Sequence, residues 1–108
     1  PWLMERIVEL LTKLDIPFAY DHFAEGESPD PPFVCYRCPS TDNFGADGIV
    51  YLDIDVIDIE LYTDKKDKVL EKKLEGLLKE YVIFYEKNVT LIESEKLYEV
   101  IYGFEEEA

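Results

Sequence analysis

Two cysteines separated by two residues, Cys35 and Cys38, are the first candidates for chemistry in this 108-residue chain. A C-x-x-C pair does redox chemistry when it lies at a helix N-terminus, because the helix lowers the thiol pKa there. Here the pair lies in the run FVCYRC, which favours a strand with the two side chains on opposite faces. A zinc site would need two further ligands, and there is no second cysteine pair. We therefore expect two small, semi-buried thiols without redox or metal chemistry.

The only imidazole, His22, would have to serve any Cys-His or Ser-His catalytic pair. It lies close to the Gly- and Pro-rich run EGESPDPP, which favours a loop. The sequence has neither a nucleophile elbow nor a Gly-rich oxyanion loop beside it. We interpret His22 as a surface or structural residue.

A group of carboxylates, Asp53, Asp55, Asp58 and Glu60, has the spacing that would hold Mg²⁺ for phosphate chemistry, with Asp53 and Asp55 on one face of a strand. The strand lacks the basic residue that would neutralise developing charge. We therefore expect a solvated strand face. No cofactor or metal site is predicted, and the chain is not expected to be an enzyme.

The charge balance limits the partners. The 25 acidic and 11 basic residues give a formal net charge of −14. A surface of this sign repels phosphates, so specific nucleic-acid binding is not expected. It favours solubility, a basic partner, or a passage along which a polyanion slides. The acidic run at residues 105–107 is most simply a solvated tail.

No apolar run approaches the roughly 20 residues of a membrane helix, and no secretory signal is visible. We therefore expect a soluble protein made in the cytoplasm, without a membrane partner. The length predicts a single domain over residues 1–108.

Two amphipathic helices should carry the core. The first covers Trp2–Leu14, and Pro17 prevents its continuation. The second covers residues 65–81, with Thr63 or Asp64 as its cap. Its expected apolar stripe is Val69, Leu70, Leu74, Leu77, Leu78 and Tyr81.

Within that second helix, an i, i+4 pair between Glu75 and Lys79 is expected on the solvent side. Gly76 costs about 1 kcal/mol relative to Ala, so we expect it to mark close packing against the sheet.

Strand-like runs separate and follow these helices. They cover residues 18–23, 33–38 (ended by Pro39), 90–93 and 97–104, with a further short segment at 82–85. Residues 40–48 read as a polar loop that contains one large apolar residue, Phe44. The order predicts an α+β fold with a mainly antiparallel sheet of four to five strands and two amphipathic helices packed on one face.

The long strand that follows this loop changes its apolar phase. Apolar residues occupy even positions from Val50 to Val56 and odd positions from Ile57 to Leu61. A slip of one residue sends later side chains to the opposite face, so an unbroken strand needs either a β-bulge between Val56 and Ile57 or different buried faces in its two halves. The bulge is the simpler interpretation. The alternative would require cover from another subunit.

Three segments, DNFGADGIVY, IELYTDKKD and FYEKNVTLIESEKLYEVIYGF, resemble small tail-completion or tail-terminator (head-tail joining) proteins of long-tailed phages and prophages of Gram-positive bacteria. The similarity covers nearly the whole chain and includes no catalytic motif. It implies a structural virion protein, assembled in the host cytoplasm and located at the head-tail junction, that forms a ring, commonly six-fold, and caps the tail tube. Its partners would be itself, tail-tube protein and head-connector protein.

For a ring, tyrosines and an isolated aromatic residue in a polar loop are natural contacts, because they bury area while keeping a polar tip. The predicted interface residues are Asp42, Asn43, Phe44, Asp47 and Tyr51. Asp53 and Asp55 are predicted to line an acidic channel through which the genome passes without adhering. The alternative function is a monomeric acidic adaptor that binds a basic protein.

Overall fold

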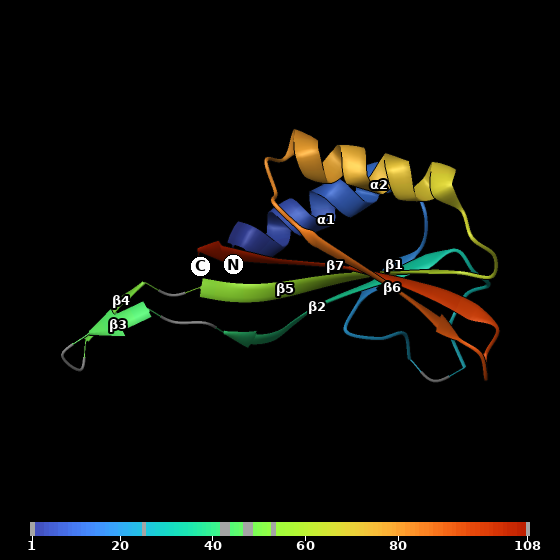
Figure 1. The fold of residues 1–108 in the computed structure, drawn as a ribbon, viewed down its shortest axis with the longest axis horizontal. Helices are drawn as coiled ribbons and strands as arrows, with labels where there is room; N and C mark the ends of the chain where they lie inside the picture. The colour runs from blue at the N-terminus through green and yellow to red at the C-terminus, as the bar shows by residue number, and fades with distance from the viewer. Residues whose placement is uncertain (1, 25, 42–43, 47–48, 53, 108) are drawn as a thin grey trace.

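The computed structural model describes residues 2–24, 26–41, 44–46, 49–52 and 54–107. Two helices lie on one face of a five-stranded sheet, and a separate two-stranded hairpin projects from the sheet (Figure 1). The elements are α1 (Trp2–Leu14), β1 (Phe18–Tyr20), β2 (Phe33–Thr41), β3 (Phe44–Ala46), β4 (Ile49–Leu52), β5 (Ile54–Thr63), α2 (Lys68–Glu80), β6 (Glu86–Ile92) and β7 (Leu97–Glu107).

The main sheet has the order β1-β2-β5-β7-β6. All neighbouring strands are antiparallel except β1 and β2, which are parallel. The predicted class is confirmed: the fold is α+β, with a mainly antiparallel sheet and two helices on one face.

The core lies between the helices and the sheet. From α1 it receives four side chains at helical spacing, and from β5 and β7 the residues that alternate toward the helices. All of these are at most 5% exposed: Ile7, Leu10, Leu11, Leu14, Ile57, Ile59, Leu61, Val100, Tyr102 and Phe104. The amphipathic first helix that the sequence predicts over Trp2–Leu14 is therefore confirmed.

Helix α2 starts later than predicted and is rotated about its axis. Asp67 is its N-cap, accepting a hydrogen bond from the Leu70 amide at 3.0 Å, so Thr63 and Asp64 do not cap it. Five residues of the predicted apolar stripe are confirmed, because they lie in the core or pack against it: Leu70, Leu74, Leu77, Leu78 and Tyr81. Val69, the sixth, is 83% exposed. The buried residues of α2 are Glu71, Leu74, Glu75 and Leu78.

A cation from β6 explains this rotation. Lys87 Nζ lies 2.8 Å from Glu71 Oε1 and 2.8 Å from Glu75 Oε2, and the Tyr102 hydroxyl donates to Glu75 at 2.8 Å. Lys66 binds the other oxygen of Glu71 at 2.8 Å. The two glutamates can therefore face inward, because each is paired there. The predicted solvent-side pair between Glu75 and Lys79 is wrong, since Glu75 is buried.

Gly76 does not pack against the sheet, so that prediction is also wrong. It is exposed, and a Cβ built on it would meet no atom of the chain within 4 Å. Nothing in the described part of this copy explains why the helix has glycine here.

The phase change in the long strand has a different origin from the simpler interpretation. Strand β5 pairs with β7 without interruption from Ile54 to Thr63, so it has no bulge between Val56 and Ile57. The irregularity is in β2, where Arg37 pairs with Asp58 but Ser40 pairs with Val56. The extra residue of β2 falls within Cys38 and Pro39, and Pro39, which cannot donate a ladder hydrogen bond, is tolerated at bulges.

The two halves of β5 therefore present apolar residues on different faces, as in the alternative interpretation. Ile57 and Ile59 point toward the helices and are fully buried. Val56 lies on the opposite face and is half-buried.

Other boundaries also differ from the sequence prediction. Strand β2 continues through Pro39 to Thr41, and β1 ends at Tyr20. The predicted polar loop contains β3, and the predicted strand from Val50 is divided into β4 and β5. Residues 82–85 form no strand, while residues 105–107 belong to β7 instead of a solvated tail, because their backbone pairs with β5.

Within the described residues, neither helix is long and apolar enough to span a membrane.

Candidate functional site

The hairpin formed by β3 and β4, here called the hairpin arm (residues 44–46 and 49–52), extends away from the main sheet (Figure 1). Its two strands form a sheet of their own, in which Phe44 pairs with Leu52 and Ala46 with Ile49. The molecule measures 49 × 29 × 22 Å, and its radius of gyration is 15.0 Å. A compact chain of this length would have about 13 Å. The arm accounts for this elongation.

The structure brings only part of the predicted interface together. Phe44 lies in β3 and Tyr51 in β4, so both belong to the hairpin arm; their side chains are outside what the structure describes. Three further predicted interface residues also lie outside the described residues: Asp42, Asn43 and Asp47.

The two predicted channel residues separate from this group. Asp53 lies outside the described residues. Asp55 pairs with Thr41 and Glu106 and is half-buried. It has the same parity in β5 as Ile57, so it is on the face that the helices cover.

On the opposite face of the sheet, here called the open face, the described residues form no helix. At one end, a loop of the same chain covers it: Phe33 stacks on Tyr62 with ring centroids 5.1 Å apart, and Phe23 meets Phe33 edge-on at 5.5 Å. This end is therefore largely closed within one copy.

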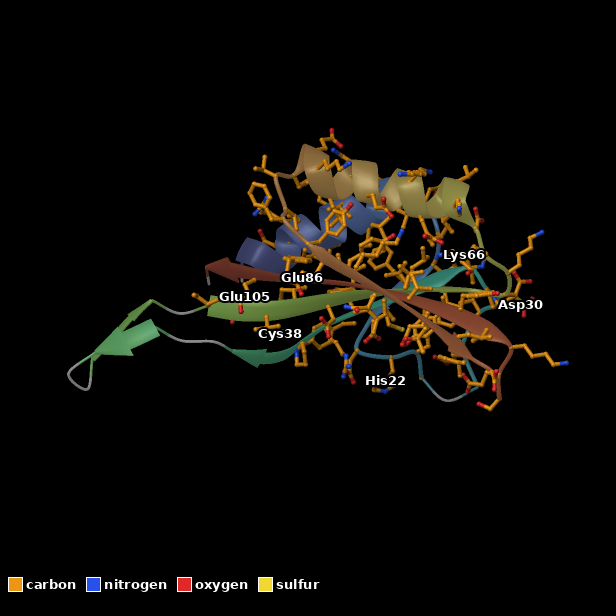
Figure 2. The ribbon with its side chains drawn as sticks, in the orientation of Figure 1. His22, Asp30, Cys38, Lys66, Glu86 and Glu105 are labelled. Atoms are coloured by element: carbon orange, nitrogen blue, oxygen red, sulfur yellow. The ribbon has the colours of Figure 1, made fainter. Side chains whose placement is uncertain are left out.

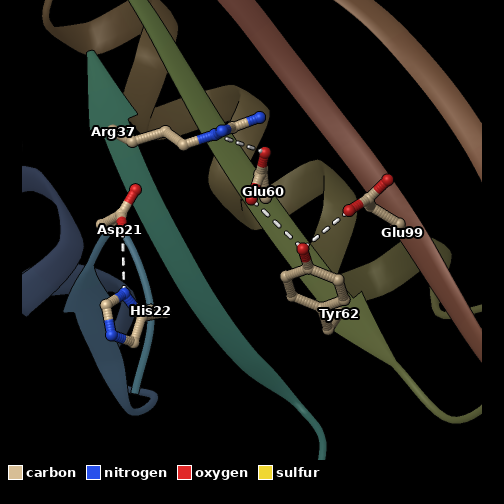
Figure 3. Close-up of polar contacts among 6 residues, drawn as sticks. All are labelled: Asp21, His22, Arg37, Glu60, Tyr62 and Glu99. Atoms are coloured by element: carbon tan, nitrogen blue, oxygen red, sulfur yellow. Dashed lines mark hydrogen bonds and ion pairs between the residues drawn. The ribbon is translucent and has the colours of Figure 1, made fainter. Parts of the chain in front are cut away.

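A polar network lies beside these rings (Figure 3). Arg37 Nε donates to Glu60 Oε2 at 3.1 Å, and the Tyr62 hydroxyl lies 3.2 Å from Glu60 Oε1 and 2.7 Å from Glu99 Oε2. Glu60 is only 6% exposed, so Arg37 and Tyr62 compensate for its burial. Burial and the bond to Glu99 raise the pKa of Tyr62, which keeps its hydroxyl a donor.

At the other end, the open face contains a hollow of about 580 Å³. Apolar Val56 and Ile101 line it together with acidic side chains of β5, β6 and β7, namely Asp58, Glu86 and Glu105. Glu86 and Glu105 lie toward the same end of the sheet (Figure 2). We call this set the acidic hollow.

Two residues shape the acidic hollow. A Cβ at Gly103 would lie 3.2 Å from Asp58 Oδ1. Glycine therefore leaves space in the hollow that a larger residue would fill. Phe84 lies at the rim and is 89% exposed. The sequence analysis missed both residues. The available signal was Ile101, Gly103 and Glu105 alternating with the core residues of β7 on the opposite parity.

The side chains considered first for chemistry are dispersed. Cys35 and Cys38 are free thiols of β2, and burial raises the pKa of Cys35, which makes its thiolate scarcer. His22 is exposed, with its Nδ1 2.8 Å from Asp21 Oδ2 (Figure 3). In the part of the chain that the structure describes, no three His, Cys, Asp or Glu residues are grouped so as to hold a metal ion.

No model of a known protein family matches this sequence, and a comparison with curated proteins finds no match.

Proposed function

We propose that this protein is a structural subunit of a phage tail, a tail-completion or tail-terminator protein that forms a ring at the head-tail junction and caps the tail tube. The observation that carries the proposal is the hairpin arm. Its strand β4 has the sequence IVYL, and in the described residues both of its strands pair only with each other. An apolar two-stranded hairpin is marginally stable alone, so a neighbouring molecule is its natural partner.

The two free surfaces support a ring. Closure requires one patch of a subunit to meet a different patch of the next. The hairpin arm and the acidic hollow are separate surfaces on different elements of the chain, so each subunit has more than one patch for its neighbours to contact. A strongly acidic ring would let a nucleic acid pass without adhering, because the net charge of −14 repels phosphates.

Assembly is tested by sedimentation velocity or mass photometry, with negative-stain electron microscopy to identify rings. The wild-type protein is measured alone and with tail-tube protein, because association can require the partner to offset the loss of subunit freedom. Rings in either condition are expected. Strictly monomeric protein in both would contradict the proposal.

A variant tests the hairpin arm directly. Phe44→Ala should weaken ring formation and leave the thermal midpoint nearly unchanged, because the arm lies outside the core. Leu91→Ala is the control, since it truncates a half-exposed apolar side chain of β6, outside the hairpin arm. A large fall in the midpoint of Phe44→Ala would place Phe44 in the core instead.

A monomeric adaptor is the second candidate, and the acidic hollow with Phe84 at its rim favours it. A protein that stays monomeric with tail-tube protein but binds a lysine-rich peptide at the hollow would support the adaptor.

A further inference from the structure

The lysines of this acidic chain are concentrated in α2 and in the segment that leads into it; the helix itself, Lys68–Glu80, has four lysines and three glutamates. Residues 65–79 contain six lysines and three acidic residues, a net charge of +3, so the remainder of the chain must carry −17 to give the total of −14. Two of the three acidic residues, Glu71 and Glu75, are buried and ion-paired. The outward surface of the helix is therefore even more positive than its sequence.

The outward residues of α2 form one stripe. At 100° per residue, Lys68, Val69, Lys72, Gly76 and Lys79 fall within an arc of about 100°. All five are exposed. We call this stripe the lysine face.

Gly76 indicates that something packs on the lysine face. A mid-helix glycine costs about 1 kcal/mol relative to alanine. Inside this copy a Cβ would meet no atom, so packing within the chain does not require the glycine. A surface that approaches the helix backbone closely from outside would require it. Val69, 83% exposed beside it, gives the same stripe an apolar contact.

The acidic hollow has the charge and shape to be that surface. Its carboxylates Asp58, Glu86 and Glu105 are opposite in sign to the lysine face, and its apolar floor matches Val69. It also lies on the sheet face that lacks a helix layer, and helix-on-sheet packing is the arrangement that closes the other face. The hairpin arm is a poorer occupant, because its connecting residues include Asp42 and Asp47 and the arm contains no basic residue.

We infer that the lysine face of one copy docks into the acidic hollow of a second copy, in a head-to-tail contact that repeats around the assembly. This inference rests on the proposed ring and names two of the patches that meet in it. Because the contact joins different surfaces of identical chains, it propagates, and the angle between the two faces decides whether the assembly closes.

Charge reversal tests the pairing. The first variant, Lys68→Glu with Lys72→Glu, reverses the lysine face. The second, Glu86→Lys with Glu105→Lys, reverses the hollow. Neither changes the buried pairs of Glu71 and Glu75 with Lys87. Glu93→Lys with Glu95→Lys, in the exposed turn between β6 and β7, is the control with the same charge change as the second variant.

Each reversed variant should associate at least about ten-fold more weakly than the wild type, because like charges then face each other. An equimolar mixture of the two should recover association, because every junction in it is again between opposite charges. Association of the wild type should weaken as salt is raised. Circular dichroism and thermal melting of each variant establish that it is folded.

The outcomes separate the two proposals. If the wild type assembles but the mixture does no better than either variant alone, the pairing of these two faces is overturned and the ring remains. The control keeps both faces and should associate like the wild type; a control that associates as weakly as the second variant would also overturn the pairing, since it would show a general charge effect. A wild type that is monomeric alone and with tail-tube protein would overturn both.

Discussion

The carboxylates on the two faces of the central sheet are stabilised by different partners. Under α2, Glu71 and Glu75 are held by Lys66, Lys87 and Tyr102 inside a closed layer. On the open face, Glu60 and Glu99 share Tyr62 at the covered end, whereas the acidic hollow at the other end has an apolar floor and no covering layer. The comparison indicates that the carboxylates of the covered face contribute to stability, whereas no described element of the chain covers the hollow.

The largest contrast should come from truncating isoleucine on each face. Ile59 is fully buried under the helices. Replacing it by alanine should lower the free energy of unfolding by about 2–5 kcal/mol, because the lost contacts leave a cavity. Ile101 is half-buried in the hollow. In the monomer, Ile101→Ala should lower the free energy of unfolding by about 1 kcal/mol, because less of its surface is buried. Urea denaturation of both variants measures the two losses.

Association provides the second half of that test. Ile101→Ala should weaken self-association, whereas folded Ile59→Ala should associate like the wild type. Equal losses of stability at the two positions would show that the hollow is part of the core and would remove the distinction between the faces.

The next effect concerns the cation between the helix and β6. Lys87→Met should cost about 3 kcal/mol at neutral pH, because it leaves two buried carboxylates without their shared partner. Exposed Lys96→Met is the control, with an expected change below about 0.5 kcal/mol. A small loss at Lys87 would mean that water or Lys66 compensates for both glutamates.

The pH dependence of that loss has a definite sign. Burial alone would raise the pKa of Glu71 and Glu75, but the ammonium groups outweigh it and lower both pKa values below the ordinary 4.5. A lowered folded-state pKa gives stability that is complete above the unfolded value and is lost as the pH falls through the folded value. Denaturation between pH 7 and 3 should therefore show the wild type losing this contribution below about pH 4.5. The deficit of Lys87→Met should shrink over the same range, since its glutamates are neutralised more easily.

The hydroxyl groups of Tyr102 and Tyr62 allow a smaller comparison between the carboxylate network under α2 and the one on the open face. Tyr102→Phe removes a buried donor to Glu75, and we expect a loss of about 2 kcal/mol, as for hydrogen bonds to charged groups. Tyr62→Phe should lose about 1 kcal/mol, because Glu60 retains Arg37 and Glu99 is less buried. The free energies of unfolding in urea give the order. A larger loss at Tyr62 would show that the open-face network contributes more to the free energy of unfolding than the covered one.

The sequence predicted the fold class, the first helix and a strand over residues 97–104, because the apolar residues of these elements follow one period without interruption. The prediction failed where the orientation or pairing of one element depends on residues that are distant in the sequence. The rotation of α2 requires Lys87, more than ten residues away, and the bulge within Cys38 and Pro39 shows only once β2 is paired with β5.

Of the candidate site, the sequence predicted Phe44 and Tyr51 as interface residues, which stays a prediction, and it did not point to the acidic hollow. Its lining residues, among them Asp58, Glu86 and Ile101, come from three strands that are brought together only by the sheet register. No local spacing contains that information.

The smallest expected effect is also the most discriminating, because it has opposite signs for one copy and for the assembly. Gly76→Ala should stabilise the monomer by about 1 kcal/mol, since alanine favours the helix and its methyl group meets open space. If a second copy approaches α2 at this point, the same methyl group should weaken association. Gly76→Ser gives a second variant of slightly larger size. Lys73→Ala, off the lysine face, removes the hydrogen bond from Lys73 Nζ to the Leu14 carbonyl at 3.1 Å, so it should lower stability and leave association unchanged. A monomer that melts higher while its assembly dissociates at a higher concentration would locate the contact at Gly76; unchanged association would place the partner elsewhere on the molecule.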